Sequence, residues 1–232
     1  MSSTFVRDTR KNKPRKEAWK RLLVASTGAI ALMFLVFNGY KEAPPSVDPP
    51  RQVDGTQPLV MKGGDPHIRA LMRMISASEA NDRDPYSIMY GGDRISDLSR
   101  HPERCVPIVV GPNVGNCSTA AGRYQFLDTT WEEKAKRYHP EPPGFMFWKA
   151  YSFEAGFQDA VVYAWLVDRD AWGMDIPAEL EKGNLERVLR RLSGTWTSLG
   201  YGIENNSMTR NLPTIYQRIL QEELQNVKTE QN

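Results

Sequence analysis

The chain has 232 residues, of which 40% are apolar and 25% are charged. This balance is typical of a folded protein and excludes an intrinsically disordered chain, and the length suffices for one domain of ordinary size plus an appendage. The net charge of +2 is too small to indicate nucleic-acid binding by itself, so the distribution of charge along the chain is more informative.

Residues 1–21 form a basic tail. Between Arg7 and Arg21 the sequence has eight lysines and arginines but only two acidic residues. Such a block is found in tails that bind nucleic acid, at the flank of a membrane segment, and at termini that are merely solvated. The segment that follows favours the membrane flank.

Residues 22–40 contain no charged side chain and predict a transmembrane helix. These 19 residues, at about 1.5 Å each, reach roughly 28 Å, which is close to the thickness of a hydrocarbon core. Trp19 and Tyr40 lie at the two ends, and the basic tail places the N-terminus in the cytoplasm. A cleaved signal peptide is the alternative, but no small-x-small site follows the apolar run. We therefore expect a retained signal anchor.

Residues 41–66 predict a linker. Six prolines and three glycines fall in this stretch, where they favour an extended and poorly packed chain. Residues 67–226 then form the candidate domain, and 227–232 a C-terminal tail.

The candidate domain begins with an amphipathic helix at residues 67–80. Asp65 and Pro66 supply a start signal just before it. Its apolar residues recur at i, i+3, i+4 and i+7, which is the spacing of one helical face: Ile68, Leu71, Met72 and Ile75.

The next part of the domain, residues 81–112, is rich in Gly, Asp, Pro and Ser. Its short apolar pieces at 87–92 and 105–111 predict a small β-hairpin or a long ordered loop. Helical patterns follow at 127–139 (with Asp128 or Thr129 as the cap), 152–172, 178–196 and 212–225. The pattern indicates an α+β domain that is mostly helical, or an all-α domain.

Cys105 and Cys117 are the only cysteines, and both follow the membrane segment. An oxidising compartment favours their pairing, and closing so short a loop would add about 3 kcal/mol of stability. Two unpaired buried thiols are the alternative. No histidine or cysteine has zinc-ligand spacing, so we expect neither a metal nor a cofactor.

Glu79 stands out in the first helix. It follows Leu71 and Ile75 on the same face, so the carboxyl group shares the apolar stripe at the helix C-terminus. Burial raises the pKa of a carboxyl group, and so does the partial negative charge of a helix C-terminus. Such a group can stay protonated near neutral pH and act as a general acid. The pattern alone equally allows a glutamate that bends out to water.

Several motifs along the candidate domain resemble those of a known family. They are residues 68–80, 90–92, 99–102, 119–126, 158–160 and 200–202, together with Asp97, Trp131 and Trp196. In this order they resemble the lambda phage endolysin-like family of lytic transglycosylases, which are lysozyme-like enzymes. The resemblance covers about residues 67–224, and its most specific part is the combination of Ser78-Glu79 with residues 121–125.

The resemblance implies a lysozyme-like domain with a small β-hairpin or long loop, acting as a peptidoglycan lytic transglycosylase. In this family one glutamate, here Glu79, protonates the leaving oxygen of the β-1,4 bond between N-acetylmuramic acid and N-acetylglucosamine. It then accepts a proton from the muramic acid C6 hydroxyl, which closes a 1,6-anhydro ring. A hydrolysing muramidase and a non-catalytic peptidoglycan-binding envelope protein are the alternatives.

The resemblance also implies which side chains bind the glycan strand. Residues 122–125 stand where the family has a Gly-x-x-Gln element, so Arg123, Tyr124 and Gln125 are expected at the substrate. Gln125 would hydrogen-bond sugar or orient the glutamate, and Tyr124 would pack or stack. A structural turn is the alternative. Tyr201 resembles a late tyrosine near the glutamate, and a core tyrosine is its alternative.

Other polar side chains are assigned to structure. His101 is expected to be a structural hydrogen-bonding residue. The aspartates after the first helix are expected in turns unless one faces Glu79 across the cleft, which would favour hydrolysis: Asp82, Asp84, Asp93 and Asp97. Phe145, Phe147 and Trp148 are expected in the core, with a sugar-stacking rim as the alternative.

Ala80 departs from the family, which usually has glycine after the catalytic glutamate. Alanine disfavours a left-handed helix cap, so we expect the helix to run slightly longer here.

The expected location is the bacterial inner membrane, with one span at 22–40 and a periplasmic domain. The expected partners are a peptidoglycan glycan strand and lipid, but not nucleic acid.

Overall fold

The computed structural model describes residues 56–111, 113–144, 150–201 and 209–230. The basic tail, the predicted membrane segment and residues 41–55 lie outside these ranges. Within them, no helix is both long and apolar enough to cross a membrane. The membrane segment at 22–40 therefore stays a prediction.

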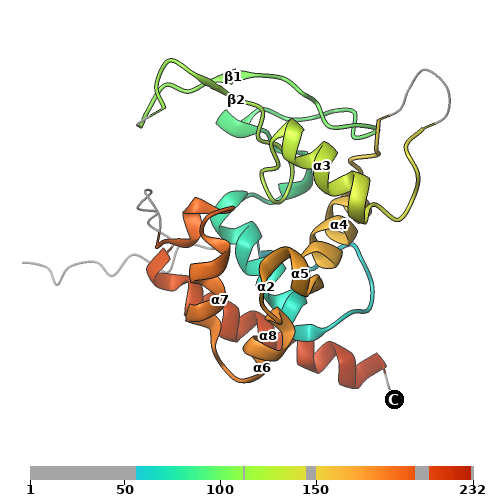
Figure 1. The fold of residues 1–232 in the computed structure, drawn as a ribbon, viewed down its shortest axis with the longest axis vertical. Coiled ribbons are helices and arrows are strands. Elements are labelled where there is room, and N and C mark those ends of the chain that lie inside the picture. Colours follow the sequence, from blue (N-terminus) through green and yellow to red (C-terminus); the bar gives the residue numbers. More distant parts are fainter. Residues whose placement is uncertain (1–55, 112, 145–149, 202–208, 231–232) are drawn as a thin grey trace, which may run out of the picture. The chain divides into compact units, whose positions relative to one another are not determined.

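α2 (Pro66–Glu79) is the helix against which several others pack (Figure 1). The Asp65 side chain caps its first turn by accepting hydrogen bonds from the N–H groups of His67 and Ile68. Residues 70–77 are all buried, so the helix is covered on every side. The helix predicted from the apolar spacing is confirmed, and its burial extends beyond the predicted stripe.

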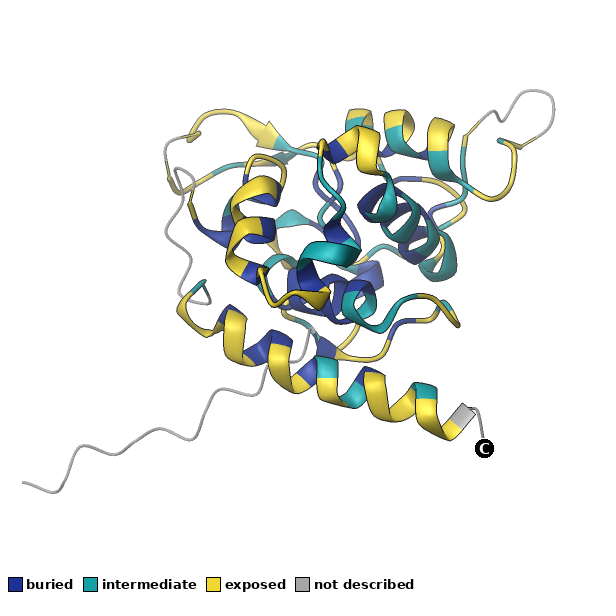
Figure 2. Ribbon diagram, turned by 60° about the horizontal axis from the view of Figure 1, so that its bottom comes forward, coloured by how far each residue is buried: buried dark blue, intermediate teal, exposed yellow. Residues whose placement is uncertain are grey.

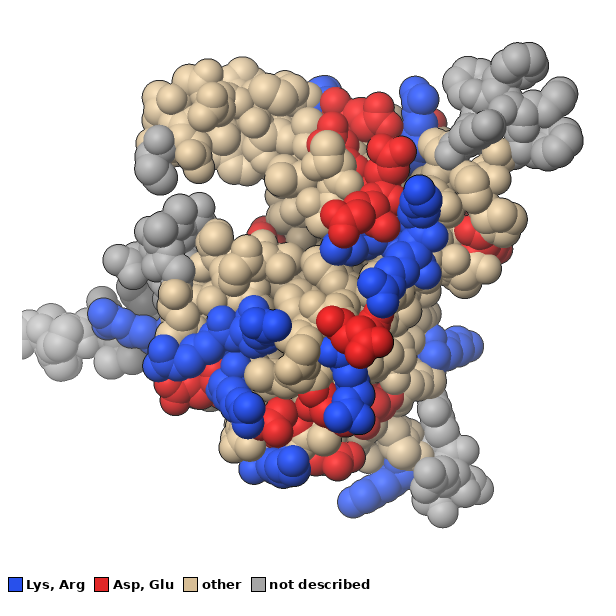
Figure 3. Space-filling model, viewed as in Figure 1, with Lys and Arg blue, Asp and Glu red and all other residues tan. Residues whose placement is uncertain are grey.

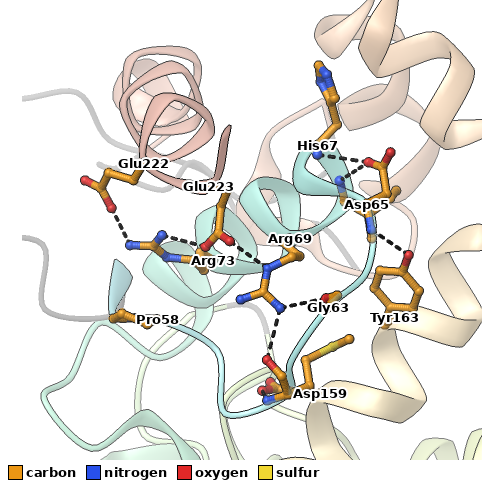
Figure 4. A network of polar contacts seen from close by, with 12 residues as sticks. Pro58, Gly63, Asp65, His67, Arg69, Arg73, Asp159, Tyr163, Glu222 and Glu223 are labelled. Carbon is orange, nitrogen blue, oxygen red and sulfur yellow. Dashed lines mark hydrogen bonds and ion pairs between the residues drawn. The ribbon is translucent and has the colours of Figure 1, made fainter. Parts of the chain in front are cut away.

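α8 (Leu212–Glu230) packs along α2 through buried ion pairs as well as apolar contacts (Figure 4). Glu223 accepts from Arg73 at 2.7 Å and from Arg69 at 2.6 Å. Glu222 reaches Arg73 at 2.6 Å from a more exposed position. The side chains of Arg73 and Glu223 are almost wholly buried, which is tolerable because each charge is paired.

Residues 56–65 belong to the folded domain, which corrects the predicted end of the linker. Leu59 is buried in the core, and the N–H groups of Val60 and Met61 donate to Asp159 at 2.8 and 3.1 Å. The Pro and Gly content suggested a loosely packed chain. An irregular segment can nevertheless be fixed where its backbone groups bond to a buried carboxylate.

Two predicted helices are each divided in two. Between residues 127 and 193 the described α-helices are α3 (Asp128–Tyr138), α4 (Ala155–Val167), α5 (Arg169–Trp172), α6 (Ile176–Glu181) and α7 (Leu185–Leu192). Asp168 ends α4 and caps α5 with its side chain. Gly183, at a φ of 79°, lies between α6 and α7. The predicted side-chain cap of α3 is wrong, because Asp128 is already helical and Leu127 is the cap residue.

The described strands are β1 (Val106–Pro107) and β2 (Cys117–Ser118), which pair antiparallel. A disulfide joins Cys105 to Cys117, whose Cα atoms are 5.4 Å apart, so the two thiols are not free. The disulfide lies at the base of a hairpin whose tip exposes Val109 to solvent.

Residues 87–92, predicted to belong to a small β-hairpin or a long ordered loop, lie in an ordered loop. This part of the chain forms 3-10 turns and isolated bridges, including one from Met89 to Ala121. The short turns are η2 (Pro85–Ser87), η3 (Tyr90–Gly92), η4 (Thr197–Leu199) and η5 (Thr209–Asn211). Gly91 within η3 has a φ of 84°, which breaks a regular strand.

The described chain is thus mostly helical with a small two-stranded sheet, in agreement with the predicted α+β class. Figure 2 shows buried residues on the inner sides of the helices, while the outer side of α8 is exposed. The core is one apolar cluster that includes residues of α2, α4, α7 and α8.

Candidate active site

Glu79 is the last residue of α2 and is partly buried. Its Oε1 accepts a hydrogen bond from the hydroxyl of Ser198 in η4. Ala80 follows with a φ of −133° and donates its N–H to Ser76 O, so the helix stops without a left-handed residue. The expectation that the helix runs longer at Ala80 is wrong, because the backbone of this residue has left the helical conformation.

The C-terminal end of α2 lies on the side of the domain that carries β1 and β2 (Figure 1). Figure 3, in the same view, shows the surface hollowed between the β1–β2 segment and the helices below it. Residues 105–122 contain no charged side chain, so this wall of the hollow is neutral. The candidate acid therefore ends a helix on the hollowed side of the domain.

Residues 121–126 form a tight turn on this side of the domain. Ala121 and Phe126 exchange both backbone hydrogen bonds, at 3.0 and 2.9 Å, and Gly122 N–H donates to Ile88 O at 2.8 Å. Gln125 has a φ of 48°, which is rare for a residue with a side chain. Its amide donates to Gly122 O at 3.0 Å and stays partly exposed. Strained residues of this kind gather at functional sites.

Arg123 and Tyr124 are wholly buried, so the prediction that they bind substrate is wrong. The Tyr124 hydroxyl donates to Asp159 at 2.6 Å, and burial raises the pKa of Tyr124 well above its usual value. Arg123 donates to the Tyr86 hydroxyl at 2.8 Å and to Pro58 O at 3.1 Å. Both side chains support the turn from its buried side, where a glycan on the surface would not contact them.

Asp159 is the buried centre of this supporting network. The sequence placed it in the motif at residues 158–160 but gave it no role. It accepts from the hydroxyls of Tyr86 and Tyr124 and from two backbone N–H groups of residues 60 and 61. Its neighbour Gln158 accepts from Arg123 N–H at 2.9 Å. The single charged side chain of helix α4 was the available signal, since buried carboxylates need partners.

Ser198 is a residue that sequence reasoning missed. It lies three residues before Tyr201, between Trp196 and the motif at residues 200–202. Next to it, Trp196 donates its indole N–H to Tyr124 O at 3.1 Å, which connects η4 to the turn at 121–126. The segment that carries Ser198 thus contacts both the end of α2 and the turn that carries Gln125.

Tyr201 is half-exposed and has a φ of 64°. The guanidinium of Arg190 lies over its ring at 4.2 Å from the centroid. This exposure rules out the alternative of a core tyrosine. Its expected role toward a glycan stays a prediction.

The aspartates after α2 occupy turns. Asp82 accepts from Asp84 N–H at 2.7 Å and pairs with Arg94 at 2.8 Å. Burial raises the pKa of Asp82, but these bonds outweigh it and hold that pKa below its usual value. Asp93 pairs with Arg104, and Asp97 caps a turn through Ser99 N–H. These contacts agree with the structural role expected for them.

His101 is a buried structural residue, as expected. Its Nε2 bonds to Phe126 O at 2.8 Å, and its Nδ1 accepts from Glu103 N–H at 3.2 Å. Burial lowers the pKa of His101, which favours the neutral ring.

Phe145, Phe147 and Trp148 lie outside the described residues. Among the described residues, no group of three or more acidic, His or Cys side chains is placed to hold a metal.

Comparison with known proteins gives one consistent result. Residues 69–221 match the family model described as Endolysin. The chain is 28% identical to the endolysin of Escherichia phage lambda over 144 residues, which cover 58% of this chain and 79% of that protein.

Two solved structures are similar to this domain. The bacteriophage lambda lysozyme complexed with a chitohexasaccharide matches with a TM-score of 0.50 and 25% identity, over 68% of this chain and 97% of that one. A structure of the lysozyme from bacteriophage lambda matches with a TM-score of 0.49 and 24% identity, over 70% and 97% of the two chains.

Proposed function

Because the chain belongs to the endolysin family of peptidoglycan-degrading enzymes, we propose that it is a lytic transglycosylase with Glu79 as its general acid and base. The substrate is the β-1,4 bond between N-acetylmuramic acid and N-acetylglucosamine. The product carries a 1,6-anhydro-muramic acid end. One observation carries this proposal: a partly buried carboxyl group ends the central helix and is held by a buried hydroxyl.

Glu79 performs two proton transfers in this mechanism. Its carboxyl group first donates a proton to the leaving glycosidic oxygen, and the bond to the muramic acid C1 breaks. The resulting carboxylate then takes the proton of the C6 hydroxyl, whose oxygen closes onto C1. The carboxyl group is restored, and no water is consumed.

The aspartates support this pathway over hydrolysis. A retaining or inverting glycosidase needs a second carboxylate that is free to act as a nucleophile or base. Asp82, which follows Glu79 most closely, is engaged by Arg94 and by Asp84 N–H. A hydrolysing muramidase remains the second candidate, and the products distinguish the two.

Gln125 and Tyr201 are the proposed glycan contacts. Both side chains have exposed area and both lie at positive φ, so their backbones are held in unusual conformations. The lambda lysozyme in complex with a chitohexasaccharide supports a glycan strand as the ligand of this fold. We also propose that residues 22–40 anchor the domain outside the cytoplasmic membrane.

The test is a pair of variants assayed on purified peptidoglycan. Glu79→Gln should lower the rate of clearing at least about 100-fold, because it removes the general acid. Glu181→Gln is the matched control, since Glu181 also ends a helix but is exposed. It should clear peptidoglycan at the original rate. Equal clearing by both variants would contradict the assignment of Glu79.

Mass spectrometry of the released fragments tests the reaction type. Anhydro products are lighter than hydrolytic products by one water. Fragments that all carry the extra water would replace the transglycosylase with a muramidase. That outcome would leave Glu79 as the acid but require a second catalytic group.

A further inference from the structure

Ser198 contacts the proposed catalytic carboxyl group directly. We infer that Ser198 is a positioning residue: its hydroxyl donates to Glu79 Oε1 and holds the carboxyl group in one orientation through both proton transfers. This inference rests on the proposed role of Glu79 and adds the residue that orients its carboxyl group.

The Ser198 hydroxyl is fixed in place. The residue is only 6% exposed and lies in η4, between the buried residues Trp196 and Leu199. Its carbonyl oxygen accepts from the Thr209 hydroxyl at 3.2 Å. Because both the backbone and the side chain are packed, the hydroxyl has few orientations other than those that reach its partners.

The hydroxyl has two neighbours, Glu79 Oε1 and the hydroxyl of Ser78 at 3.0 Å. A serine supplies one hydrogen and can accept two. The Ser78 hydroxyl can donate to Ile75 O, at 2.9 Å, or to Ser198 Oγ. When Glu79 is ionised, the single hydrogen of Ser198 goes to the carboxylate oxygen, since hydrogen bonds to a charged acceptor are the stronger ones.

This arrangement serves both protonation states of Glu79. In the neutral acid, the Ser198 hydroxyl can donate to the carboxyl group or accept from it, so the contact is kept. After the proton has passed to the leaving oxygen, the same hydroxyl stabilises the carboxylate. A carboxyl group that acts first as an acid and then as a base needs a hydrogen-bond partner that keeps its position through both steps.

The Ser198 bond favours the ionised form of Glu79 more than the neutral form. Other charged groups lie on the elements that pack around α2, and they do not replace this bond because they face other partners or solvent. They are Glu222 and Glu223 of α8 with Arg69 and Arg73, Asp159 of α4 with Tyr86 and Tyr124, Glu179 of α6 with Arg187, exposed Glu181 of α6, Arg190 of α7 with Tyr201, and Asp82 with Arg94.

The test compares the full chain with Ser198→Ala across pH on purified peptidoglycan. The acid step needs protonated Glu79, so the rate falls as pH rises through the titration of that group. Loss of the Ser198 bond lets Glu79 keep its proton to higher pH. The falling limb should therefore move up by about one pH unit, and kcat should drop about 10-fold with KM little changed.

Ser193→Ala is the matched control. Ser193 is also 6% exposed, and its hydroxyl donates to Arg190 O at the end of α7. This variant loses a buried hydroxyl of the same kind, and its pH profile should keep its position. Ser198→Cys keeps the size of the side chain but is a weaker donor, so its limb should lie between those of Ser198→Ala and the original chain.

An unshifted limb in both Ser198 variants, with soluble and folded protein, would overturn the inference. It would leave the proposed function intact if Glu79→Gln is inactive. Activity in Glu79→Gln would instead overturn the proposed function itself. The pH profiles of the Ser198 variants thus test the inference, and the activity of Glu79→Gln separately tests the proposed function.

Discussion

Gly122 is the residue on which the turn of the candidate site depends. Its φ is 73°, and a β-carbon added there would collide with Phe153 and Gln158. We expect Gly122→Ala to destabilise the domain by about 3 kcal/mol, because the strain of a left-handed residue adds to an overpacked contact. Thermal unfolding and activity on peptidoglycan measure the effect, and both should fall.

Gly92→Ala separates the two causes. Gly92 has a φ of 95° but nothing within 4 Å of an added β-carbon. This variant carries the backbone strain alone, so it should cost about 1 kcal/mol. If the two variants lose equal stability, the collision with Phe153 and Gln158 is not what makes glycine necessary at residue 122.

Individual site residues could be predicted from the sequence only in part. The spacing placed Glu79 on the apolar face of a helix, and the structure has it partly buried at the end of that helix. The spacing could not place Arg123 and Tyr124, because their burial is decided by Asp159 and by residues 57–60, which are distant in sequence. The resemblance supplied the motif but not the direction of its side chains.

At the scale of elements, the contact between α2 and α8 holds the helix that carries Glu79. Glu223 is 2% exposed and binds both Arg69 and Arg73 (Figure 4). We expect Glu223→Gln to lower the free energy of unfolding by about 3 kcal/mol, since it leaves two guanidinium groups short of a buried counter-charge. Chemical denaturation measures this change.

Glu222→Gln is the control for the α2–α8 contact. Its side chain is 41% exposed, although it also pairs with Arg73. Ion pairs that are open to solvent contribute at most about 1 kcal/mol, so this variant should be close to the original chain. A large loss in Glu222→Gln, equal to that of Glu223→Gln, would show that burial is not the deciding factor.

The helices were easier to predict than their boundaries. The apolar spacing predicted segments that are indeed helical in α2, α3, α4, α7 and α8. It could not predict the breaks at Asp168 and Gly183, because a side chain that caps a new helix and a left-handed glycine both act over one or two residues. Periodicity over a whole window averages such local signals away.

At the scale of the whole molecule, the described domain follows residues 1–55, for which only the sequence gives a prediction. Residues 56–65 are bound to the domain by hydrogen bonds to Asp159 and Tyr163. A tether that starts at residue 40 would therefore be shorter than the predicted linker of residues 41–66. With the anchor proposed for residues 22–40, the spacer would be residues 41–55.

The membrane anchor is the prediction at this scale. The full chain should sediment with membranes and resist extraction at alkaline pH, whereas residues 41–232 should be soluble. Leu32→Arg with Leu35→Arg should release the full chain, since each arginine near the centre of a span costs about 3 kcal/mol. Leu32→Ile with Leu35→Ile keeps the hydrophobicity and should stay bound.

The soluble form should clear purified peptidoglycan as fast as the anchored form, because the reaction needs only the folded domain. A full chain found in the soluble fraction would contradict the anchor and leave the enzyme assignment untouched.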